Sequence, residues 1–294
     1  MTTAYLNGSF LPLTEARVSV LDRGFLFADG VYEVIPVYGG RAFSLTAHLQ
    51  RLHRSLQAIL LENPLNTAGW QDMIQSLLAL DLAEAGSQDR MLYIQVTRGA
   101  TAARSHALPE KPEPTVLAFC QPLPVMPDAV RENGVSAITR PDTRWLHCDV
   151  KSIALLGNVL LSQQALSQGC NEAILLRDGQ LTEGASSNVF VIRDGQVFTP
   201  PNSPELLPGI TRDLVLTLTE QAGLARHEQA VSEAQLRAAE EIWITSSTRE
   251  LYPVTRLDEQ AIGNGKPGPL WARVYQEFQD FKRAYAAQRN SDPS

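Results

Sequence analysis

The sequence contains few lysines and few cysteines. Only four of its 294 residues are lysine, and one of them, Lys151, stands directly before a long apolar segment. The three cysteines, Cys120, Cys148 and Cys170, are odd in number and widely spaced. They therefore form neither a zinc-ligand pattern nor a disulfide framework. We expect no bound metal, and a reducing, cytoplasmic setting.

Positive charge and long apolar runs are also scarce. The net charge is −7 and no basic run or stripe appears, which argues against a nucleic-acid partner but leaves room for a compact arginine site for a small anion. No apolar run is long enough to cross a membrane. The first residues lack the charged and apolar regions of a secretory signal. We therefore expect small-molecule partners rather than nucleic acid or membrane.

Hydrophobic periodicity predicts a mixed α/β (α+β) fold. We expect strands near 5–10, 31–35, 91–97, 115–119, 135–139, 172–176, 180–182, 189–192 and 241–245, and helices over 45–61, 68–82, 153–166, 208–222, 233–239 and 269–288. Three prolines within 121–127 favour an extended linker. We therefore place a small domain at 1–120 and a larger one at 128–294, with frayed residues at 290–294.

Lys151 is the residue with the clearest chemical potential. It closes the stretch Arg144-Trp145-Leu146-His147-Cys148-Asp149-Val150-Lys151, and the apolar segment 153–166 follows it. An apolar helix of small residues is expected to be buried, so the amine at its start should be partly desolvated, which favours the neutral nucleophile. Such an amine suits Schiff-base chemistry. On position alone, however, a lysine whose charge reaches solvent is the simpler interpretation.

Other residues suit a phosphorylated ligand. Gly209-Ile210-Thr211 opens an expected helix, where N–H groups and the helix dipole attract an anion. Ser246 and Ser247 follow a strand and offer hydroxyls, and Arg51 supplies a charge that can bind phosphate in a bidentate manner. Each has a simpler interpretation by itself: a helix cap for the threonine, a turn for the serines and a surface charge for the arginine.

Five motifs in a fixed order resemble one family. They are Asp22-Arg23-Gly24 with Asp29-Gly30-Val31-Tyr32-Glu33-Val34, Arg104-Ser105-His106, the stretch from Arg144 to Ser152, Thr182-Glu183-Gly184 with Ser187-Asn188-Val189-Phe190, and Gly209-Ile210-Thr211-Arg212. With these motifs the sequence resembles the fold-type IV pyridoxal-phosphate enzymes over residues 5 to 262, and above all the bacterial D-amino-acid (D-alanine) aminotransferases. The resemblance implies a small N-terminal α/β domain and a larger, β-barrel-like C-terminal domain with flanking helices.

The resemblance also implies roles around pyridoxal 5′-phosphate. Lys151 forms the Schiff base and moves the substrate proton. Glu183, which alone would pass for a solvated loop carboxylate, pairs with the pyridine nitrogen and keeps it protonated, so that the ring accepts electrons. The remaining cofactor-binding residues are Arg51, Ile210, Thr211, Ser246 and Ser247 at the phosphate, Leu207 on the ring face and Ser186 near the cofactor.

The same resemblance implies which substrate binds. Tyr32, Arg104 and His106 hold the α-carboxylate, and the arginine and histidine come from the neighbouring subunit, so the enzyme is a homodimer with shared active sites. Arg98 is an alternative carboxylate ligand, but Arg104-Ser105-His106 matches better. The expected reaction moves the amino group of D-alanine and other D-amino acids to 2-oxoglutarate in a ping-pong cycle.

Three alternatives differ in chemistry. One is a lyase of the aminodeoxychorismate type, which eliminates pyruvate without an amino acceptor. Another is a transaminase for branched-chain L-amino acids or R-amines, against which the Arg104-Ser105-His106 loop argues. The last is a cofactor-binding protein without catalysis, which the presence of Lys151 and Glu183 disfavours.

Overall fold

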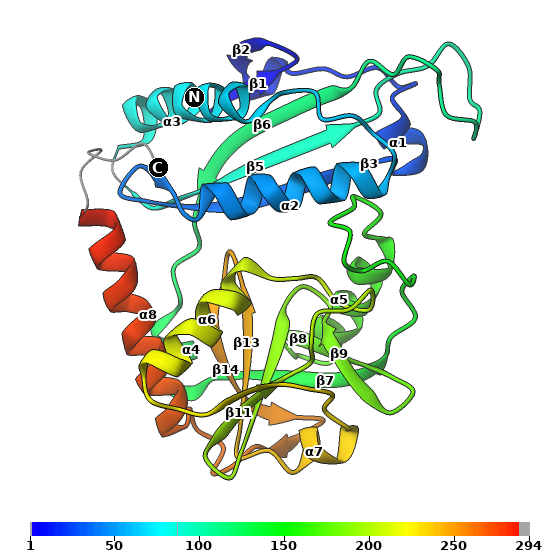
Figure 1. Cartoon of the computed structure of the whole chain (residues 1–294). Helices are drawn as coiled ribbons and strands as arrows, with labels where there is room; N and C mark the ends of the chain where they lie inside the picture. The colour runs from blue at the N-terminus through cyan, green and yellow to red at the C-terminus, as the bar shows by residue number, and fades with distance from the viewer. Residues whose placement is uncertain (1, 87, 288–294) are drawn as a thin grey trace. The chain divides into compact units, whose positions relative to one another are not determined.

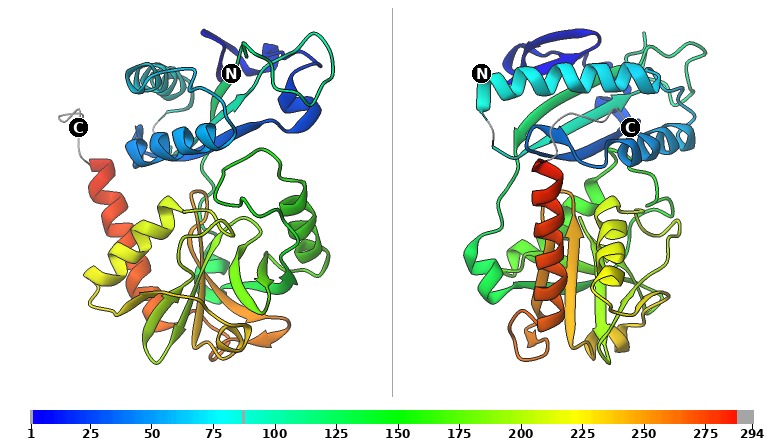
Figure 2. Two further views of the ribbon diagram at one scale, coloured as in Figure 1. Left: turned by 45° about the vertical axis from the view of Figure 1, so that its right-hand side comes forward. Right: turned by 60° about the vertical axis from the view of Figure 1, so that its left-hand side comes forward.

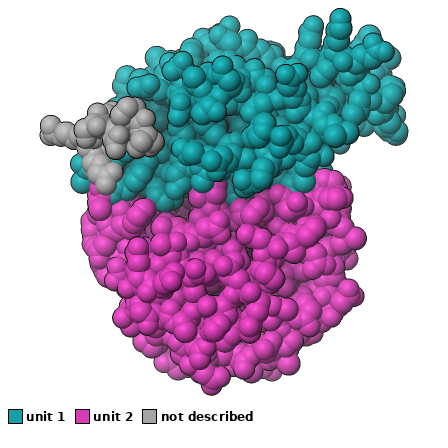
Figure 3. Space-filling model, in the orientation of Figure 1, with its two compact units in different colours: residues 1–123, 150–154, 285–294 teal, residues 124–149, 155–284 magenta. Residues whose placement is uncertain are grey.

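The computed structural model describes residues 2–86 and 88–287. The chain forms two compact units (Figure 3). Unit 1 comprises Met1–Leu123, Val150–Ala154 and Tyr285–Ser294, and unit 2 comprises Pro124–Asp149 and Leu155–Ala284. Lys151 therefore belongs to unit 1. The expected frayed segment 290–294 lies outside the described residues. The domain limits 1–120 and 128–294 stay a prediction, because compactness does not test independent folding.

Unit 1 is built on a six-stranded antiparallel sheet of order β2-β1-β6-β5-β3-β4. Its strands are β1 (Thr3–Leu6), β2 (Ser9–Pro12), β3 (Gly30–Tyr38), β4 (Arg41–Ala42), β5 (Arg90–Thr97) and β6 (Thr115–Pro122), with helices η1 (Leu13–Glu15), α1 (Arg23–Phe27), α2 (Leu45–Ala58) and α3 (Thr67–Ala85). Asn7 and Gly8 join β1 to β2 in a hairpin, with positive φ angles of 49° and 95°.

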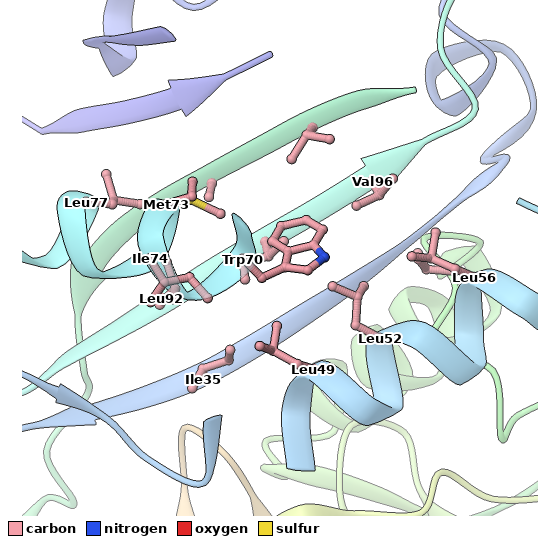
Figure 4. Close-up of a cluster of buried hydrophobic side chains, with 14 of the residues drawn as sticks. Ile35, Leu49, Leu52, Leu56, Trp70, Met73, Ile74, Leu77, Leu92 and Val96 are labelled. Atoms are coloured by element: carbon pink, nitrogen blue, oxygen red, sulfur yellow. The ribbon is translucent and has the colours of Figure 1, made fainter. Parts of the chain in front are cut away.

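Helices α2 and α3 pack on one face of this sheet (Figures 2 and 4). Apolar residues at helical spacing on α2 (Leu49, Leu52, Leu56) and α3 (Trp70, Met73, Ile74, Leu77) meet alternate residues of the strands, such as Ile35, Leu92 and Val96. The alternation of the strand places Glu33 on the same face as Ile35, whereas Tyr32 points to the other face.

Unit 2 contains a nine-stranded mixed sheet with flanking helices (Figure 1). Its strands are β7 (Val135–Pro141), β8 (Glu172–Arg177), β9 (Gln180–Gly184), β10 (Asn188–Arg193), β11 (Gln196–Thr199), β12 (Arg226–Glu228), β13 (Glu241–Ser246), β14 (Glu250–Leu257) and β15 (Gln260–Ala261). Its helices are α4 (Asp128–Asn133), α5 (Leu156–Ser167), α6 (Ile210–Gln221), α7 (Glu233–Arg237) and most of α8 (Pro269–Ala287). The strands run in the order β12-β11-β10-β13-β14-β7-β8-β9, and β15 pairs with β14.

The sheet of unit 2 curls, as Figure 1 shows. Its strands contribute side chains to two separate apolar clusters. One apolar cluster joins β10 and β13 to α6 and α8 through Phe190, Trp243, Val215 and Trp271. A second cluster on β7, β9, β13 and β14 includes Ile244. The expected mixed α/β fold with flanking helices is confirmed. None of the helices in the described part of the chain is long and apolar enough to cross a membrane.

The expectation of a buried helix after Lys151 was wrong. Helix α5 begins at Leu156, and Leu156, Val159 and Leu160 are 71%, 58% and 55% exposed. Only Leu161 and Ala165, one helical turn apart, are buried, because α5 packs on β7 and β8 through this narrow stripe. An apolar composition predicts burial only where a second element covers the helix.

Candidate active site

The backbone of Lys151 is fixed beside β3 and α2. The Tyr32 N–H donates to the Lys151 carbonyl at 2.9 Å, and the Lys151 N–H donates to Ser55 Oγ on α2 at 3.1 Å. Ser152 forms a bridge with Val31. The Lys151 side chain is half-buried, and its Nζ lies 4.3 Å from the centre of the Tyr32 ring. The structure thus brings together the predicted Schiff-base lysine and one predicted substrate ligand.

Arg51 lies on α2 and is oriented by Glu33. Its Nε and Nη2 donate to Oε1 and Oε2 of Glu33, both at 2.8 Å, and His48 Nδ1 lies 2.8 Å from Oε2. Glu33 is fully buried; burial opposes its charge, but Arg51 outweighs this and holds the pKa of Glu33 far below its usual range. Sequence reasoning missed Glu33 and His48. The signal for Glu33 was a carboxylate on the apolar face of a strand.

Arg104 and His106 lie in the loop between β5 and β6, residues 98–114, and their side chains are exposed. Both pack on the ring of Phe27 in α1: the Arg104 guanidinium lies 4.9 Å and the His106 ring 5.1 Å from its centre. The structure thus brings these two predicted carboxylate ligands to one place.

Arg98 occupies a different environment. It is 3% exposed, and its Nε and Nη2 donate to Asp29 at 2.8 and 3.1 Å. Its Nη1 and Nη2 donate to the carbonyls of Leu60 and Ile59 at 3.0 and 2.5 Å. These bonds join the start of the β5–β6 loop to the end of α2. Arg98 therefore has a structural role, which favours Arg104 as the carboxylate ligand.

Glu183 in unit 2 is a buried carboxylate held on both oxygens. Oε1 accepts from Arg144 Nη1 at 2.6 Å, and Oε2 accepts from the Leu207 N–H at 3.0 Å and from Asn188 Nδ2 at 3.3 Å. Arg144 also grips Asp142 through Nε and Nη2, at 2.9 and 2.8 Å. Burial raises the pKa of Glu183 to about 7, although Arg144 and the Leu207 N–H favour its charge.

Four of the five residues expected at a phosphate, Ile210, Thr211, Ser246 and Ser247, lie at the start of α6 and at the end of β13. Gly209 is the N-cap of α6 and has no side chain to satisfy the first N–H groups, which have no partner within the helix. Thr211 lies inside the helix and is buried, so it is not the cap. Ser246 ends β13 and its Oγ accepts from the Arg249 N–H at 3.2 Å, and Ser247 follows in the turn.

Gly209 is required by a close approach. A Cβ at this position would lie 1.9 Å from Asn188 Oδ1. The same Asn188 amide donates to the Leu207 carbonyl at 2.9 Å as well as to Glu183. The start of α6, the Leu207 backbone and the Glu183 carboxylate are thus connected through one side chain. Sequence reasoning gave no role to Asn188 or Arg144, although both stand inside the quoted motifs.

Ser186 is exposed in the turn between β9 and β10. Its Oγ donates to Glu172 Oε2 at 3.1 Å, and Ser187 Oγ donates to the same oxygen at 2.9 Å. Arg249 Nη1 completes the group at 2.7 Å. Glu172 therefore joins the turn that carries Ser186 to the turn that carries Ser247.

The donor set of unit 2 fits a phosphorylated pyridine. A buried carboxylate with a raised pKa gains from a cationic N–H partner, and a protonated pyridine nitrogen is such a partner. The N–H groups at the start of α6 and the serine hydroxyls after β13 are donors for a phosphate.

Comparison with known proteins places the chain in a family. Residues 30–257 match the family model for amino-transferase class IV. The chain is 42% identical to a D-alanine aminotransferase of Bacillus licheniformis over 93% of this chain and 95% of that protein. It is 37% identical to a D-alanine aminotransferase of Staphylococcus haemolyticus over 96% of this chain and 98% of that protein.

A solved structure has the same fold. A branched-chain amino acid aminotransferase from T.th., solved with pyridoxamine 5′-phosphate, superposes with a TM-score of 0.87 at 25% identity, over 96% of this chain and 94% of that one. The expected fold type is thereby confirmed. The chain belongs to the class IV aminotransferases, which are pyridoxal-phosphate enzymes.

Proposed function

We propose that this chain transfers the amino group of D-alanine and other D-amino acids to 2-oxoglutarate, with pyridoxal 5′-phosphate as cofactor and a ping-pong cycle. The observation that carries the proposal is the identity of 42% and 37%, over nearly the whole chain, to two proteins named D-alanine aminotransferase. The pairing of Arg104 and His106 on one ring adds geometric support for a carboxylate-binding site.

Lys151 is the proposed catalytic residue. When bound, pyridoxal phosphate supplies an aldehyde that takes up the amino group and a ring that accepts electrons. Lys151 would hold the cofactor through its amine, and the same amine would carry the proton between the substrate Cα and the cofactor C4′. The bonds from Tyr32 and Ser55 fix the backbone from which the amine reaches.

The other proposed cofactor ligands contact its pyridine nitrogen, its phosphate and its ring. Glu183 keeps a proton on the pyridine nitrogen. Arg51, Ile210, Thr211, Ser246 and Ser247 bind the phosphate; Leu207 contacts the ring, and Ser186 lies beside the cofactor. Support comes from the orientation of Arg51 by Glu33, from the uncapped start of α6 and from the bond between Leu207 and Glu183.

Tyr32, Arg104 and His106 bind the substrate α-carboxylate. A guanidinium, an imidazole and a phenol offer several donors to one carboxylate. When the carboxylate is fixed on one side and the Cα hydrogen faces Lys151, only one enantiomer fits. Arg104 and His106 are contributed by the second subunit of a homodimer. Cytoplasmic location is part of the proposal and rests on the three free thiols.

The deciding experiment is the half-reaction followed by the visible absorbance of the bound cofactor. D-alanine should bleach this absorbance and release pyruvate, L-alanine should not, and 2-oxoglutarate should restore it. Lys151→Ala should abolish turnover. Faster bleaching by L-alanine would refute the proposed stereochemistry, and pyruvate release from aminodeoxychorismate without an acceptor would assign a lyase.

A further inference from the structure

Phe27 contacts three charged or polar side chains at once. Besides Arg104 and His106, the Arg23 guanidinium lies 4.9 Å from the centre of its ring. The ring is half-buried at the end of α1, whereas Arg104 and His106 stand in an irregular loop and are exposed. A single aromatic side chain thus contacts both loop residues assigned to substrate binding. A guanidinium near the face of an aromatic ring and an edge-to-face pair of rings are both favourable contacts.

Arg23 fixes the backbone of the same loop. It is 4% exposed, and its Nη1 donates to the carbonyls of Ser105 and Ala107 at 2.5 and 3.3 Å. Its Nε donates to Asp29 Oδ2 at 2.7 Å, the oxygen that also accepts from Arg98 Nε at 2.8 Å. The loop is therefore tied to the core of unit 1 through two buried arginines and one carboxylate, and is not held by its own contacts alone.

We propose that Phe27 is a positioning and specificity-determining residue, which presents Arg104 and His106 as one unit to the substrate carboxylate, while Arg23 holds the loop backbone beneath them. This inference rests on the proposed function, since it assigns the loop to carboxylate binding. Both side chains are exposed, and without a support they would sample several rotamers. The shared ring restricts both, so binding a carboxylate costs less ordering.

The test compares Phe27→Leu with Phe25→Leu. Phe25 lies on the same helix and is 74% exposed, so its replacement is a matched control. Phe27→Leu should raise the KM for D-alanine about threefold to tenfold, with a smaller change in kcat and a lower preference for D- over L-alanine. In an Arg104→Ala background the same change should raise KM less, because one of the residues that Phe27 positions is already missing.

Trypsin provides a readout that does not depend on activity. Within the loop, Arg98 is buried and Lys111 precedes proline, so the Arg104–Ser105 bond is the one that trypsin can reach. Phe27→Leu should speed cleavage there about threefold to tenfold if the ring orders the loop. Arg23→Lys, which keeps the charge but loses the fork of donors, should do the same. The melting temperature checks that each variant is folded.

The outcomes separate the two proposals. Wild-type cleavage and an unchanged KM in folded Phe27→Leu would overturn the role of Phe27. Faster cleavage with an unchanged KM would also overturn it, because the ordered loop would then not bind the carboxylate. If the wild-type enzyme fails to convert D-alanine, the proposed function is refuted, and the role of Phe27 in specificity falls with it even where cleavage shows an ordered loop.

Discussion

At the scale of the residue, Glu183 shows how one carboxylate depends on its neighbours. It is buried on β9, between the Arg144 guanidinium and the Leu207 N–H. Asp142 lies on the far side of Arg144 and shares its charge. The positive charge of Arg144 is thus divided between two carboxylates, which leaves burial free to raise the pKa of Glu183 to about 7.

This raised pKa predicts a pH dependence of stability in the cofactor-free protein. The usual value is 4.5, so between pH 4.5 and 7 the folded state binds a proton that the unfolded chain releases. The free energy of unfolding should therefore fall as pH rises through this window, by about 3 kcal/mol from this group. Glu183→Gln should remove this component, as measured by denaturant unfolding at several pH values.

The matched control is Glu220→Gln, whose side chain is 68% exposed. It should leave the pH dependence of the wild type unchanged. If the curves of the wild type and Glu183→Gln run parallel between pH 4.5 and 7, Glu183 titrates at its usual pKa and the argument from burial is wrong.

Sequence motifs predicted individual site residues but not the residues that support them. Lys151, Glu183 and Arg104 stand in motifs, and their roles stay predictions. Glu33 and Phe27 stand in a quoted motif or next to one, yet their contacts with Arg51 and Arg104 depend on which face of the strand or helix they occupy. Such contacts bring together residues far apart in the chain, and no spacing rule predicts them.

At the scale of the element, the start of α6 depends on the absence of a side chain. Gly209 has a φ of −77°, which any residue adopts, so its requirement is steric rather than conformational. A Cβ there would displace Asn188, which donates to both Glu183 and the Leu207 carbonyl. The start of α6 and the Glu183 carboxylate are therefore linked through Asn188, so a change at Gly209 should also affect Glu183.

Gly209→Ala should consequently destabilise the protein by about 1–3 kcal/mol and weaken cofactor binding. Thermal unfolding and titration with pyridoxal phosphate measure the two effects. Gly69→Ala in the first turn of α3 is the control: its Cβ would make ordinary contacts of 3.4 Å or more, so it should be neutral or slightly stabilising. Equal behaviour of the two variants would contradict the steric argument.

Periodicity identified most elements of both units, but in unit 2 it missed β14 and β15, among others. Pro253 lies inside β14, and a proline argues against a central strand. The turn from β14 to β15 uses Asp258 and Glu259 with positive φ angles of 47° and 67°, where glycine or asparagine would have signalled a hairpin. The linker expected at 121–127 begins as strand, because Pro122 still pairs with Arg90 at the end of β6.

At the scale of the whole molecule, the proposed homodimer makes a sharp prediction. Lys151→Ala removes the catalytic amine and Arg104→Ala removes a substrate ligand, so each homodimer should be nearly inactive at low D-alanine. In a mixed dimer, however, one site combines Lys151 of one chain with Arg104 of the other. Co-expression of the two variants should restore activity in about a quarter of all sites.

The measurement is the turnover of D-alanine by the co-purified mixture, compared with each variant alone. Lys151→Ala co-expressed with Lys151→Ala carrying a second tag serves as the control and should stay inactive. If the mixture is no more active than the sum of its parts, Arg104 acts within its own chain, and the shared site is refuted.

The shared ring of Phe27 has a consequence for how such enzymes diverge. Two of the three proposed substrate ligands, Arg104 and His106, stand in one exposed loop, while Lys151 is fixed by backbone bonds to β3 and α2. Insertions and substitutions in the loop leave those bonds intact. Related enzymes can therefore acquire a new substrate range through changes in this loop, while the reaction at Lys151 stays the same.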